Sequence, residues 1–304
     1  MKPIIILGPT AIGKTDLAIS LTKKIDAEII SADSMQIYKF MDIGTAKPSK
    51  EEQKEAKHHL IDFKMPNEKF SAGEFAKAAE KIIEDLKGKG KNALIVGGTG
   101  FYVDALVNGI DSIERVDEKV KLFFDDFCEE MGSYELFKWL EIIDEEWAER
   151  IHPNDSQRIK RALSVYVSLK KPLSSFFKSK DDNRTDFFIF VLTSSREFLK
   201  KRIRKRTALM VENGLVEETK RLIDMGFSDC DALKSIGYKE TVDFLEGRIK
   251  TKDELVEAIV KSTLDYAKRQ LTFFRSRFKN ARWINVESEN AEQVILNTVL
   301  SHLS

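Results

Sequence analysis

A phosphate-binding loop near the start of the chain constrains the fold more than any other feature of the sequence. Residues 4–20 read IIILGPTAIGKTDLAIS, which matches the motif G-x-x-x-x-G-K-[ST] at Gly8, Gly13, Lys14 and Thr15. The apolar run before the motif is typical of a buried parallel strand, and the apolar residues after it recur at helical spacing. This order of strand, loop and helix predicts an α/β fold with a P-loop NTPase-like core.

Further strands are predicted along the chain, with helical patterns between them. They lie at 28–32, 92–96, 187–192 and 282–286. Strands that alternate with helices are typical of a mostly parallel sheet flanked by helices, because parallel strands need long crossover connections.

One connection is much longer than a crossover requires. About ninety residues separate the strands at 92–96 and 187–192. Their middle reads as three successive helices, at 119–131, 133–143 and 155–169. We therefore expect a catalytic core made of residues 1–110 and 186–304, and an inserted all-helical domain at 111–185.

The overall charge of the chain is balanced, with 50 Lys and Arg against 50 Asp and Glu. The charges are nevertheless segregated, since 111–155 holds 15 acidic and 5 basic residues, whereas 196–206 holds 7 basic and 1 acidic.

Two cysteines, Cys128 and Cys230, are too few for a disulfide framework and suit a reducing compartment. Because the apolar runs are too short for a signal peptide or a membrane span, we expect a cytoplasmic protein.

Only one position in the sequence offers the strand-terminal aspartate that P-loop enzymes commonly carry. Such enzymes use an aspartate at the end of another strand to help hold Mg²⁺. The strand at 28–32 is followed by Asp33, whereas the strands at 92–96 and 187–192 run into GGTG and TSS. Because the carboxyl ends of the strands line one crevice, Asp33 is expected near the phosphate loop. The residue pattern alone leaves two roles open for Asp33, a magnesium ligand or a base that faces a substrate amine.

A set of motifs in a fixed order resembles one enzyme family. The motifs are GPTAIGKT, ADSMQIY, DIGTAKP, HHLID, VGGTGFY, SQRIKRAL, IGYKE and YAKRQLTFFR. Together they span about residues 4–283 and resemble the tRNA dimethylallyltransferases, also called tRNA isopentenyltransferases. The resemblance implies transfer of a dimethylallyl group from dimethylallyl diphosphate to the exocyclic amine of adenosine 37, in tRNAs that read codons beginning with U.

The resemblance also implies roles for residues around the phosphate loop. Backbone amides, Lys14, Arg206 and Mg²⁺ held by Thr15 would stabilise the charge that gathers on the departing diphosphate. Asp33 would accept the proton of the adenine amine as the new bond forms. The catalytic residues are thus expected to be Asp33, Thr15, Arg206 and Lys14. The diphosphate-binding residues are expected to be Gly8, Pro9, Thr10, Ala11, Ile12, Gly13, Lys14, Thr15 and Arg202.

A tRNA substrate must place its adenine in a protein pocket, which requires that the base leave the stack. Bases of an anticodon loop are easier to displace than those of a duplex. By resemblance, the tRNA-binding residues are Asp33, Ser34, Met35, Gln36, Thr99, Lys121, Gln157, Arg158, Ile159, Lys160, Arg161, Lys268, Arg269 and Gln270. The inserted domain is expected to contact the anticodon stem-loop, and the protein is expected to act as a monomer.

Three other functions share some of these features. They are a P-loop nucleotide kinase or ATPase, an isopentenyltransferase that acts on free adenine nucleotides, and a nucleic-acid binder without catalysis. The basic stretch QRIKR within the predicted insertion favours RNA over a free nucleotide. For the two arginines at 202 and 206, an exposed basic helix face is the structural alternative. His58 and His59 have no metal-ligand spacing, so a turn or core role is expected for both.

Overall fold

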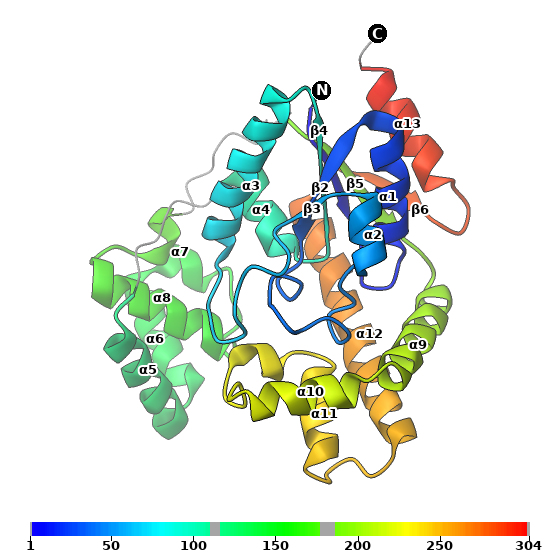
Figure 1. The fold of residues 1–304 in the computed structure, drawn as a ribbon. Helices are drawn as coiled ribbons and strands as arrows, with labels where there is room; N and C mark the ends of the chain where they lie inside the picture. The colour runs from blue at the N-terminus through cyan, green and yellow to red at the C-terminus, as the bar shows by residue number, and fades with distance from the viewer. Residues whose placement is uncertain (1, 110–115, 177–185, 303–304) are drawn as a thin grey trace. The chain divides into compact units, whose positions relative to one another are not determined.

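The computed structural model describes residues 2–109, 116–176 and 186–302 of the chain. The chain forms two compact units, one made of residues 1–107 and 184–304 and the other of residues 108–183 (Figure 1). The domain boundaries expected from the sequence, at 111 and 185, lie outside the described residues.

A six-stranded parallel sheet forms the centre of the first unit, which confirms the predicted α/β class. Its strands are β1 Ile4–Leu7, β2 Ala27–Ala32, β3 His58–His59, β4 Asn92–Gly97, β5 Phe188–Thr193 and β6 Arg282–Asn285. Their order is β3-β2-β4-β1-β5-β6, and every pairing is parallel. In this order β4 separates β1 from β2, so the phosphate loop and Asp33 leave the sheet from strands that are not neighbours. The strand β3 was not predicted, because two residues are too few to give a pattern.

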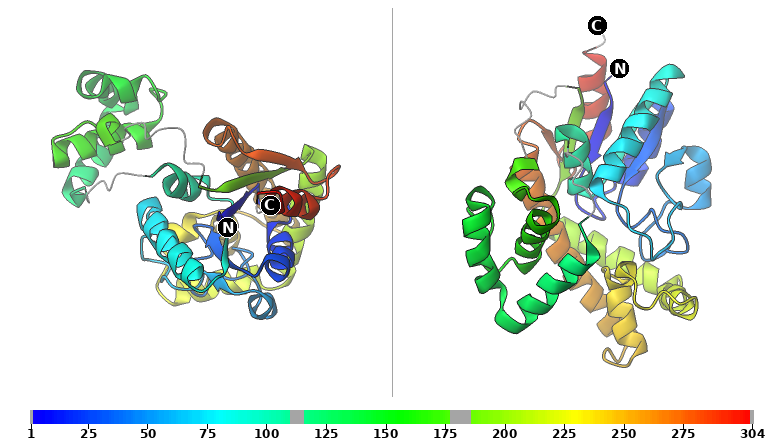
Figure 2. Two further views of the ribbon diagram at one scale, coloured as in Figure 1. Left: turned by 90° about the horizontal axis from the view of Figure 1, so that it is seen from above. Right: turned by 90° about the vertical axis from the view of Figure 1, so that its left-hand side faces the viewer.

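Helices cover both faces of the sheet. They are α1 Lys14–Ile25, α2 Lys50–Glu55, α3 Ala72–Gly88, α4 Gly100–Asn108, α9 Arg196–Glu212, α10 Leu215–Asp224, α11 Tyr238–Leu245, α12 Lys252–Arg277 and α13 Ala291–Leu300, with a short 3-10 helix η2 at Asp231–Lys234. α1 and α13 lie on one face of the sheet, and α3 and α4 lie on the other (Figure 2). All four residues of β1 are fully buried, as expected for a central parallel strand.

A glycine separates α9 from α10. Gly214 has a φ of 104°, in the left-handed region that other residues adopt only at a cost. The chain therefore turns between α9 and α10, and α9 packs along α12. This turn lets α9 run past the phosphate loop while α10 packs against α11.

The second unit is helical throughout its described residues. Its elements are α5 Glu118–Met131, α6 Ser133–Ile143, α7 Glu145–Ala148, α8 Ser156–Leu169 and a 3-10 helix η1 at Leu173–Phe176. Its core is built from apolar residues of these helices, among them Phe124, Leu136, Leu140 and Leu163. Asp155 caps α8, since its side chain accepts a hydrogen bond from the amide of Arg158.

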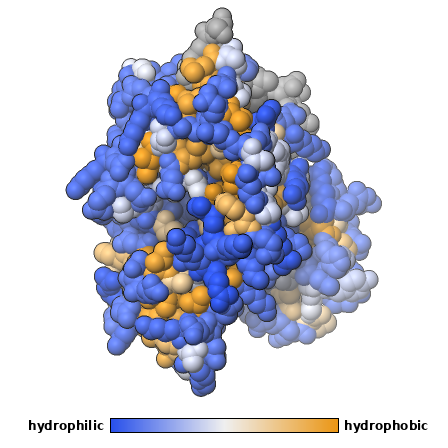
Figure 3. All heavy atoms as spheres, turned by 90° about the vertical axis from the view of Figure 1, so that its right-hand side faces the viewer, coloured by the Kyte–Doolittle hydropathy of each residue, from blue (hydrophilic) through white to orange (hydrophobic). Residues whose placement is uncertain are grey.

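The surface of the first unit that carries α9 and α13 is mostly hydrophilic (Figure 3). Its apolar side chains form separate small patches, which is ordinary for a folded protein. Within the described residues, no helix is both long and apolar enough to cross a membrane.

Candidate active site

The phosphate loop connects β1 to α1 at the carboxyl edge of the sheet. Gly13 and Ala11 both have positive φ angles, 106° and 65°. Gly8 lies so close to its neighbours that a Cβ added there would be 3.0 Å from Ile12 and 3.1 Å from Leu192. The N-cap residue of α1 is Gly13, which has no side chain with which to cap the helix. The amide groups of this terminus are therefore available to an anion, as the motif requires.

Three basic side chains surround the loop. Lys14 Nζ donates hydrogen bonds to the carbonyl oxygens of Gly8 and Pro9, both at 2.9 Å. Arg206 Nη2 donates to Thr10 Oγ1 at 2.6 Å, and Arg202 Nε donates to the carbonyl oxygen of Ala11 at 2.7 Å. Both arginines thus reach the loop from α9 rather than form only an exposed basic face.

Burial shifts the pKa of two of these groups. Desolvation lowers the pKa of Lys14 to about 8 and the pKa of Arg206 to about 10, while the nearby carboxylate of Asp33 opposes both shifts. Both side chains remain positively charged at pH 7. A buried anion would be stabilised strongly here, because the cations are poorly solvated before it binds.

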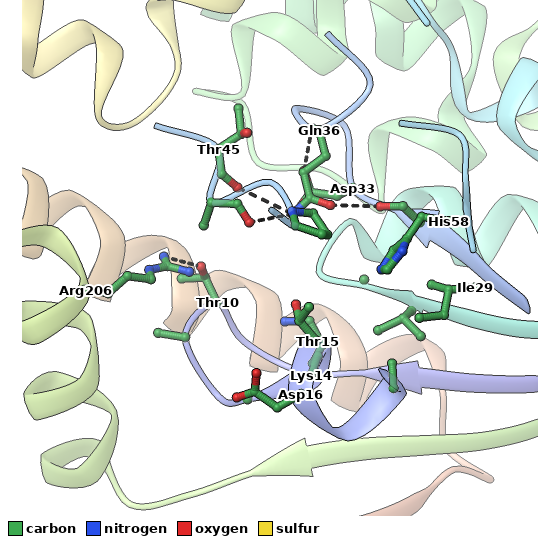
Figure 4. Close-up of a pocket in the computed structure, with 18 of the residues that line it drawn as sticks. Thr10, Lys14, Thr15, Asp16, Ile29, Asp33, Gln36, Thr45, His58 and Arg206 are labelled. Carbon is green, nitrogen blue, oxygen red and sulfur yellow. Dashed lines mark hydrogen bonds between the residues drawn. The ribbon is translucent and has the colours of Figure 1, made fainter. Parts of the chain in front are cut away.

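Asp33 is held in a fixed orientation directly after β2. Its Oδ1 accepts hydrogen bonds from the backbone amides of Met35 at 2.9 Å and Gln36 at 3.3 Å. Asp33, Lys14 and Thr15 line the same cavity, which has a volume of about 420 Å³ (Figure 4). The structure therefore brings together the acid and the phosphate loop.

Both polar and apolar residues line the cavity. Its polar lining includes Thr10, Lys14, Thr15, Arg202, Lys205 and Arg206, and its apolar lining includes Ala18, Ile29, Val96 and Leu209. A volume of this size suits a small-molecule ligand. The arrangement fits a molecule with a multiply charged anionic group and a short apolar group.

Thr99 is placed beside the residue that follows Asp33. The amide of Ser34 donates to Thr99 Oγ1 at 3.0 Å, and Thr99 Oγ1 donates in turn to Ser34 Oγ at 3.3 Å. The ends of β2 and β4 are thereby linked at the site.

Gln270 occupies a different place from the one expected of an RNA contact. Its side chain is buried, its Oε1 accepts the amide N–H of Thr10 at 3.1 Å, and its Nε2 donates to the carbonyl oxygen of Gly98 at 2.8 Å. A Cβ at Gly98 would lie only 2.4 Å from this Nε2, so the glycine makes room for the amide. Gln270 therefore ties the phosphate loop to the turn after β4 instead of offering its amide to RNA.

Tyr266 of α12 lies near Asp33. It lies one turn before Gln270 on α12, and its hydroxyl is near the side chains of Gln270 and Thr99. Burial and the nearby carboxylate of Asp33 raise the pKa of Tyr266 to about 12. Its spacing of four residues from Gln270 was the available signal, since such residues share a helix face.

The two histidines have protein partners. His58 Nδ1 donates to the carbonyl oxygen of Ala56 at 2.7 Å, and His59 Nε2 is 2.7 Å from a carboxylate oxygen of Glu28. His58 also lines the cavity, and burial lowers its pKa. No group of three His, Cys, Asp or Glu residues in the described part of the chain is placed to hold a metal ion.

The oxygen groups of the cavity nevertheless fit Mg²⁺ in another way. Thr15 and Asp33 supply a hydroxyl and a carboxylate there, which are the hard donors that Mg²⁺ prefers. Mg²⁺ commonly takes only one or two protein ligands and completes its shell with water and substrate phosphate oxygens. The absence of a larger acidic cluster is therefore compatible with Mg²⁺.

The remaining RNA candidates of the second unit lie on α5 and α8. Gln157, Arg158 and Arg161 are exposed, whereas Ile159 is fully buried in the helical core, where its side chain does not reach solvent. Three of the basic candidates form ion pairs, Lys121 with Glu118, Arg158 with Asp155, and Lys160 with Asp125. Ion pairs near the surface are weak, so these cations can exchange partners for a phosphate group.

The first unit contributes Lys268 and Arg269, both exposed on α12. The guanidinium of Arg269 lies over the ring of Tyr266, 5.8 Å from its centroid. Met35 packs at the edge of a hydrophobic cluster that includes residues of α10 and α11. The side chain of Gln36 forms hydrogen bonds with Ser31 Oγ and the carbonyl oxygen of Ala46. Ser34, Met35 and Gln36 are all partly buried.

The fold and the cavity define a P-loop α/β protein with a partly basic cavity beside the phosphate loop. A model of the IPP transferase family matches residues 36–277. The chain belongs to the IPP transferase family.

Known relatives match almost the whole chain. It is 41% identical to the tRNA dimethylallyltransferase of Acetivibrio thermocellus, over 99% of this chain and 97% of the relative. It is 45% identical to the tRNA dimethylallyltransferase of Thermotoga maritima, over 97% of this chain and 95% of the relative.

Solved structures are also similar. A full-length tRNA isopentenylpyrophosphate transferase from Bacillus halodurans is 37% identical with a TM-score of 0.71, and the match covers 99% of this chain and 96% of that one. A eukaryotic dimethylallyltransferase studied while acting on tRNA is 28% identical with a TM-score of 0.83, and the match covers 99% of this chain and 80% of that one.

Proposed function

We propose that this protein transfers the dimethylallyl group of dimethylallyl diphosphate to the exocyclic amine of adenosine 37 in tRNAs that read codons beginning with U. The observation that carries the proposal is the shared cavity of Asp33 and the phosphate loop. Relatives that are 41% and 45% identical over nearly the full chain carry the name tRNA dimethylallyltransferase, which supports the same activity here.

The phosphate loop binds the diphosphate in this proposal. The free backbone N–H groups of the loop and of the first turn of α1, together with the ammonium of Lys14, contact the phosphate oxygens, and Arg206 approaches from α9. As the allylic carbon–oxygen bond breaks, its electron pair leaves with the diphosphate. Lys14 and Arg206 stabilise the charge that develops there, and they do so strongly because both are buried.

Asp33 acts on the nucleophile, the exocyclic amine of adenine. The exocyclic nitrogen of adenine forms a bond to the allylic carbon, and its proton passes to the carboxylate of Asp33. The amides of Met35 and Gln36 hold this carboxylate in place, so little reorganisation is needed during the step. The products are N6-dimethylallyladenosine in tRNA and diphosphate.

Mg²⁺ is part of the proposal as a diphosphate-bound cation held by the hydroxyl of Thr15. When bound, it would neutralise part of the charge on the diphosphate. The oxygen donors in the cavity support this position.

The tRNA is bound by basic groups of both units in this proposal. Gln157, Arg158 and Arg161 of α8 and Lys268 and Arg269 of α12 contact the anticodon stem-loop. The adenine leaves the stack to reach Asp33, at a cost of a few kcal/mol. A cytoplasmic location and a monomeric state also belong to the proposal.

Mass spectrometry tests the function directly. The purified protein is incubated with Mg²⁺, dimethylallyl diphosphate and an anticodon stem-loop that carries adenosine at position 37. One C5H8 unit should be added per stem-loop, and none to a matched stem-loop with guanosine at that position. Equal or faster modification of free AMP would favour the nucleotide enzyme, and ATP hydrolysis without prenyl transfer would favour the kinase.

A further inference from the structure

The buried carboxylate of Glu218, which lies outside the cavity, binds the backbone of a segment that lines it. Glu218 of α10 is only 2% exposed. Its two oxygens accept hydrogen bonds from three consecutive amides, Asp42 at 2.9 Å, Ile43 at 2.9 and 3.1 Å, and Gly44 at 3.0 Å. The hydroxyl of Tyr238 donates a further bond at 2.6 Å.

This arrangement depends on the residue types present. A buried carboxylate is tolerated only when hydrogen bonds replace its hydration, and here four donors do so. A Cβ at Gly44 would lie 2.5 Å from the ring of Tyr238, so only glycine permits this approach. Glu218 and Tyr238 thereby fasten the segment 42–46 to α10 and α11.

The fastened segment reaches the site through Gln36. Gln36 Nε2 donates to the carbonyl oxygens of Ala46 at 3.2 Å and Thr45 at 3.5 Å, and Gln36 Oε1 accepts from Ser31 Oγ at 3.1 Å (Figure 4). The backbone amide of the same Gln36 donates to Asp33 Oδ1. Thr45 and Ala46 also line the cavity.

We infer that Glu218 is a positioning residue for Asp33, acting through the segment 42–46 and Gln36. This inference rests on the proposed function, in which Asp33 accepts the proton of the adenine amine. Glu218 itself is not among the residues that line the cavity. If the carboxylate were lost, the segment would loosen, Gln36 would lose its fixed acceptors, and one of the two amide hydrogen bonds that orient Asp33 would weaken.

The main test compares two buried acids of neighbouring helices. Glu218→Gln replaces an acceptor oxygen by an NH2 group that faces the N–H donors of the segment. The control is Glu240→Gln, because Glu240 is also buried and accepts a bond from the amide of Gly237 at 2.7 Å, within the first turn of α11. Tyr238→Phe removes one of the four donors and keeps Glu218, so it serves if Glu218→Gln does not fold.

We expect Glu218→Gln to lower kcat for the stem-loop about tenfold or more, with Tyr238→Phe intermediate and Glu240→Gln close to wild type. The affinity for an unreactive alkyl diphosphate should change less than about twofold, because the phosphate loop is held by other residues. An unchanged kcat for both Glu218→Gln and Tyr238→Phe would overturn the inference, as would an equal loss in Glu240→Gln.

Hydrogen exchange of the backbone amides provides a readout that does not depend on turnover. In Glu218→Gln, peptides covering 33–48 should exchange faster than in wild type, while peptides of the phosphate loop should not change. Unchanged exchange over 33–36 would overturn the coupling to Asp33. If the wild type modifies no stem-loop, the proposed function fails, yet the exchange experiment still decides whether Glu218 holds this segment.

Discussion

The amide N–H of Thr10 donates a hydrogen bond to Oε1 of Gln270 over 3.1 Å, although 260 positions separate the two residues in the chain. The side-chain Nε2 of the same Gln270 donates a hydrogen bond to the carbonyl oxygen of Gly98. Helix α12 thus fixes the phosphate loop and the turn after β4 to each other. This link makes the loop a prepared anion site rather than one that must form on binding.

Gln270→Ala should therefore weaken diphosphate binding. The amide of Thr10 and the carbonyl of Gly98 would lose their partners, which is costly for buried groups. We expect the Kd of an unreactive alkyl diphosphate to rise about tenfold, as measured by titration calorimetry. The control is Lys268→Ala on the exposed face of the same helix, and an equal effect in both variants would contradict the role of Gln270.

Arg206 should matter more for the chemical step than for RNA binding. Arg206→Gln removes a buried cation from beside Thr10. We expect the single-turnover rate to fall on the order of a hundredfold, a typical cost of losing a group that stabilises developing charge. The Kd of the stem-loop should stay near wild type. Arg202→Gln, at a more exposed position on the same helix, should give a smaller loss of rate.

The pKa of Lys14 gives diphosphate binding a defined pH dependence. Burial places this pKa at about 8 in the free protein, and only the protonated side chain attracts the anion. Below pH 8 the group is already charged, so it adds no pH dependence. Above pH 8 binding must take up a proton, and the Kd should rise by up to about tenfold per pH unit.

Calorimetry with an unreactive alkyl diphosphate in buffers of different ionisation enthalpy measures this proton uptake. At pH 9 it should be close to one proton per ligand for wild type and near zero for Lys14→Met. A Kd that stays constant between pH 7.5 and 9.5 would show that Lys14 does not titrate in this range.

The basic residues of both units should act through phosphate contacts. Arg158→Ala and Lys268→Ala should each weaken stem-loop binding and reduce the slope of log K against log salt by about one. Lys23→Ala is a suitable control, because Lys23 is paired with Glu55 on the exposed surface of α1. If a variant has the same slope as wild type, the substituted residue does not contact a phosphate group of the RNA.

The parts of the fold that depend on local pattern were predictable, and the parts that depend on long-range pairing were not. The apolar run at 4–7 and its glycine loop identified β1 and the start of α1. No local pattern placed β4 between β1 and β2, because strand order follows from how the connections pack. The two-residue strand β3 was missed for the lack of any period.

The candidate site shows the same division. Lys14, Thr15 and Asp33 follow strand ends, so the parallel sheet alone brings them to one edge. Gln270 and Glu218 belong to helices far along the chain, and their roles come from buried hydrogen bonds that no spacing reveals. Gln270 in particular was expected at the RNA because of the resemblance and the basic stretch that contains it. In the structure its side chain is buried and bonded to the phosphate loop.

The rate of a single turnover with Asp33→Asn tests most directly whether the carboxylate accepts the proton of the adenine amine. The variant keeps the size of the side chain and an oxygen that can accept the amides of Met35 and Gln36, but it cannot take up the proton. We expect a rate at least about a hundredfold below wild type, with unchanged Kd values for the stem-loop and an alkyl diphosphate. A wild-type rate in Asp33→Asn would contradict the proposed mechanism.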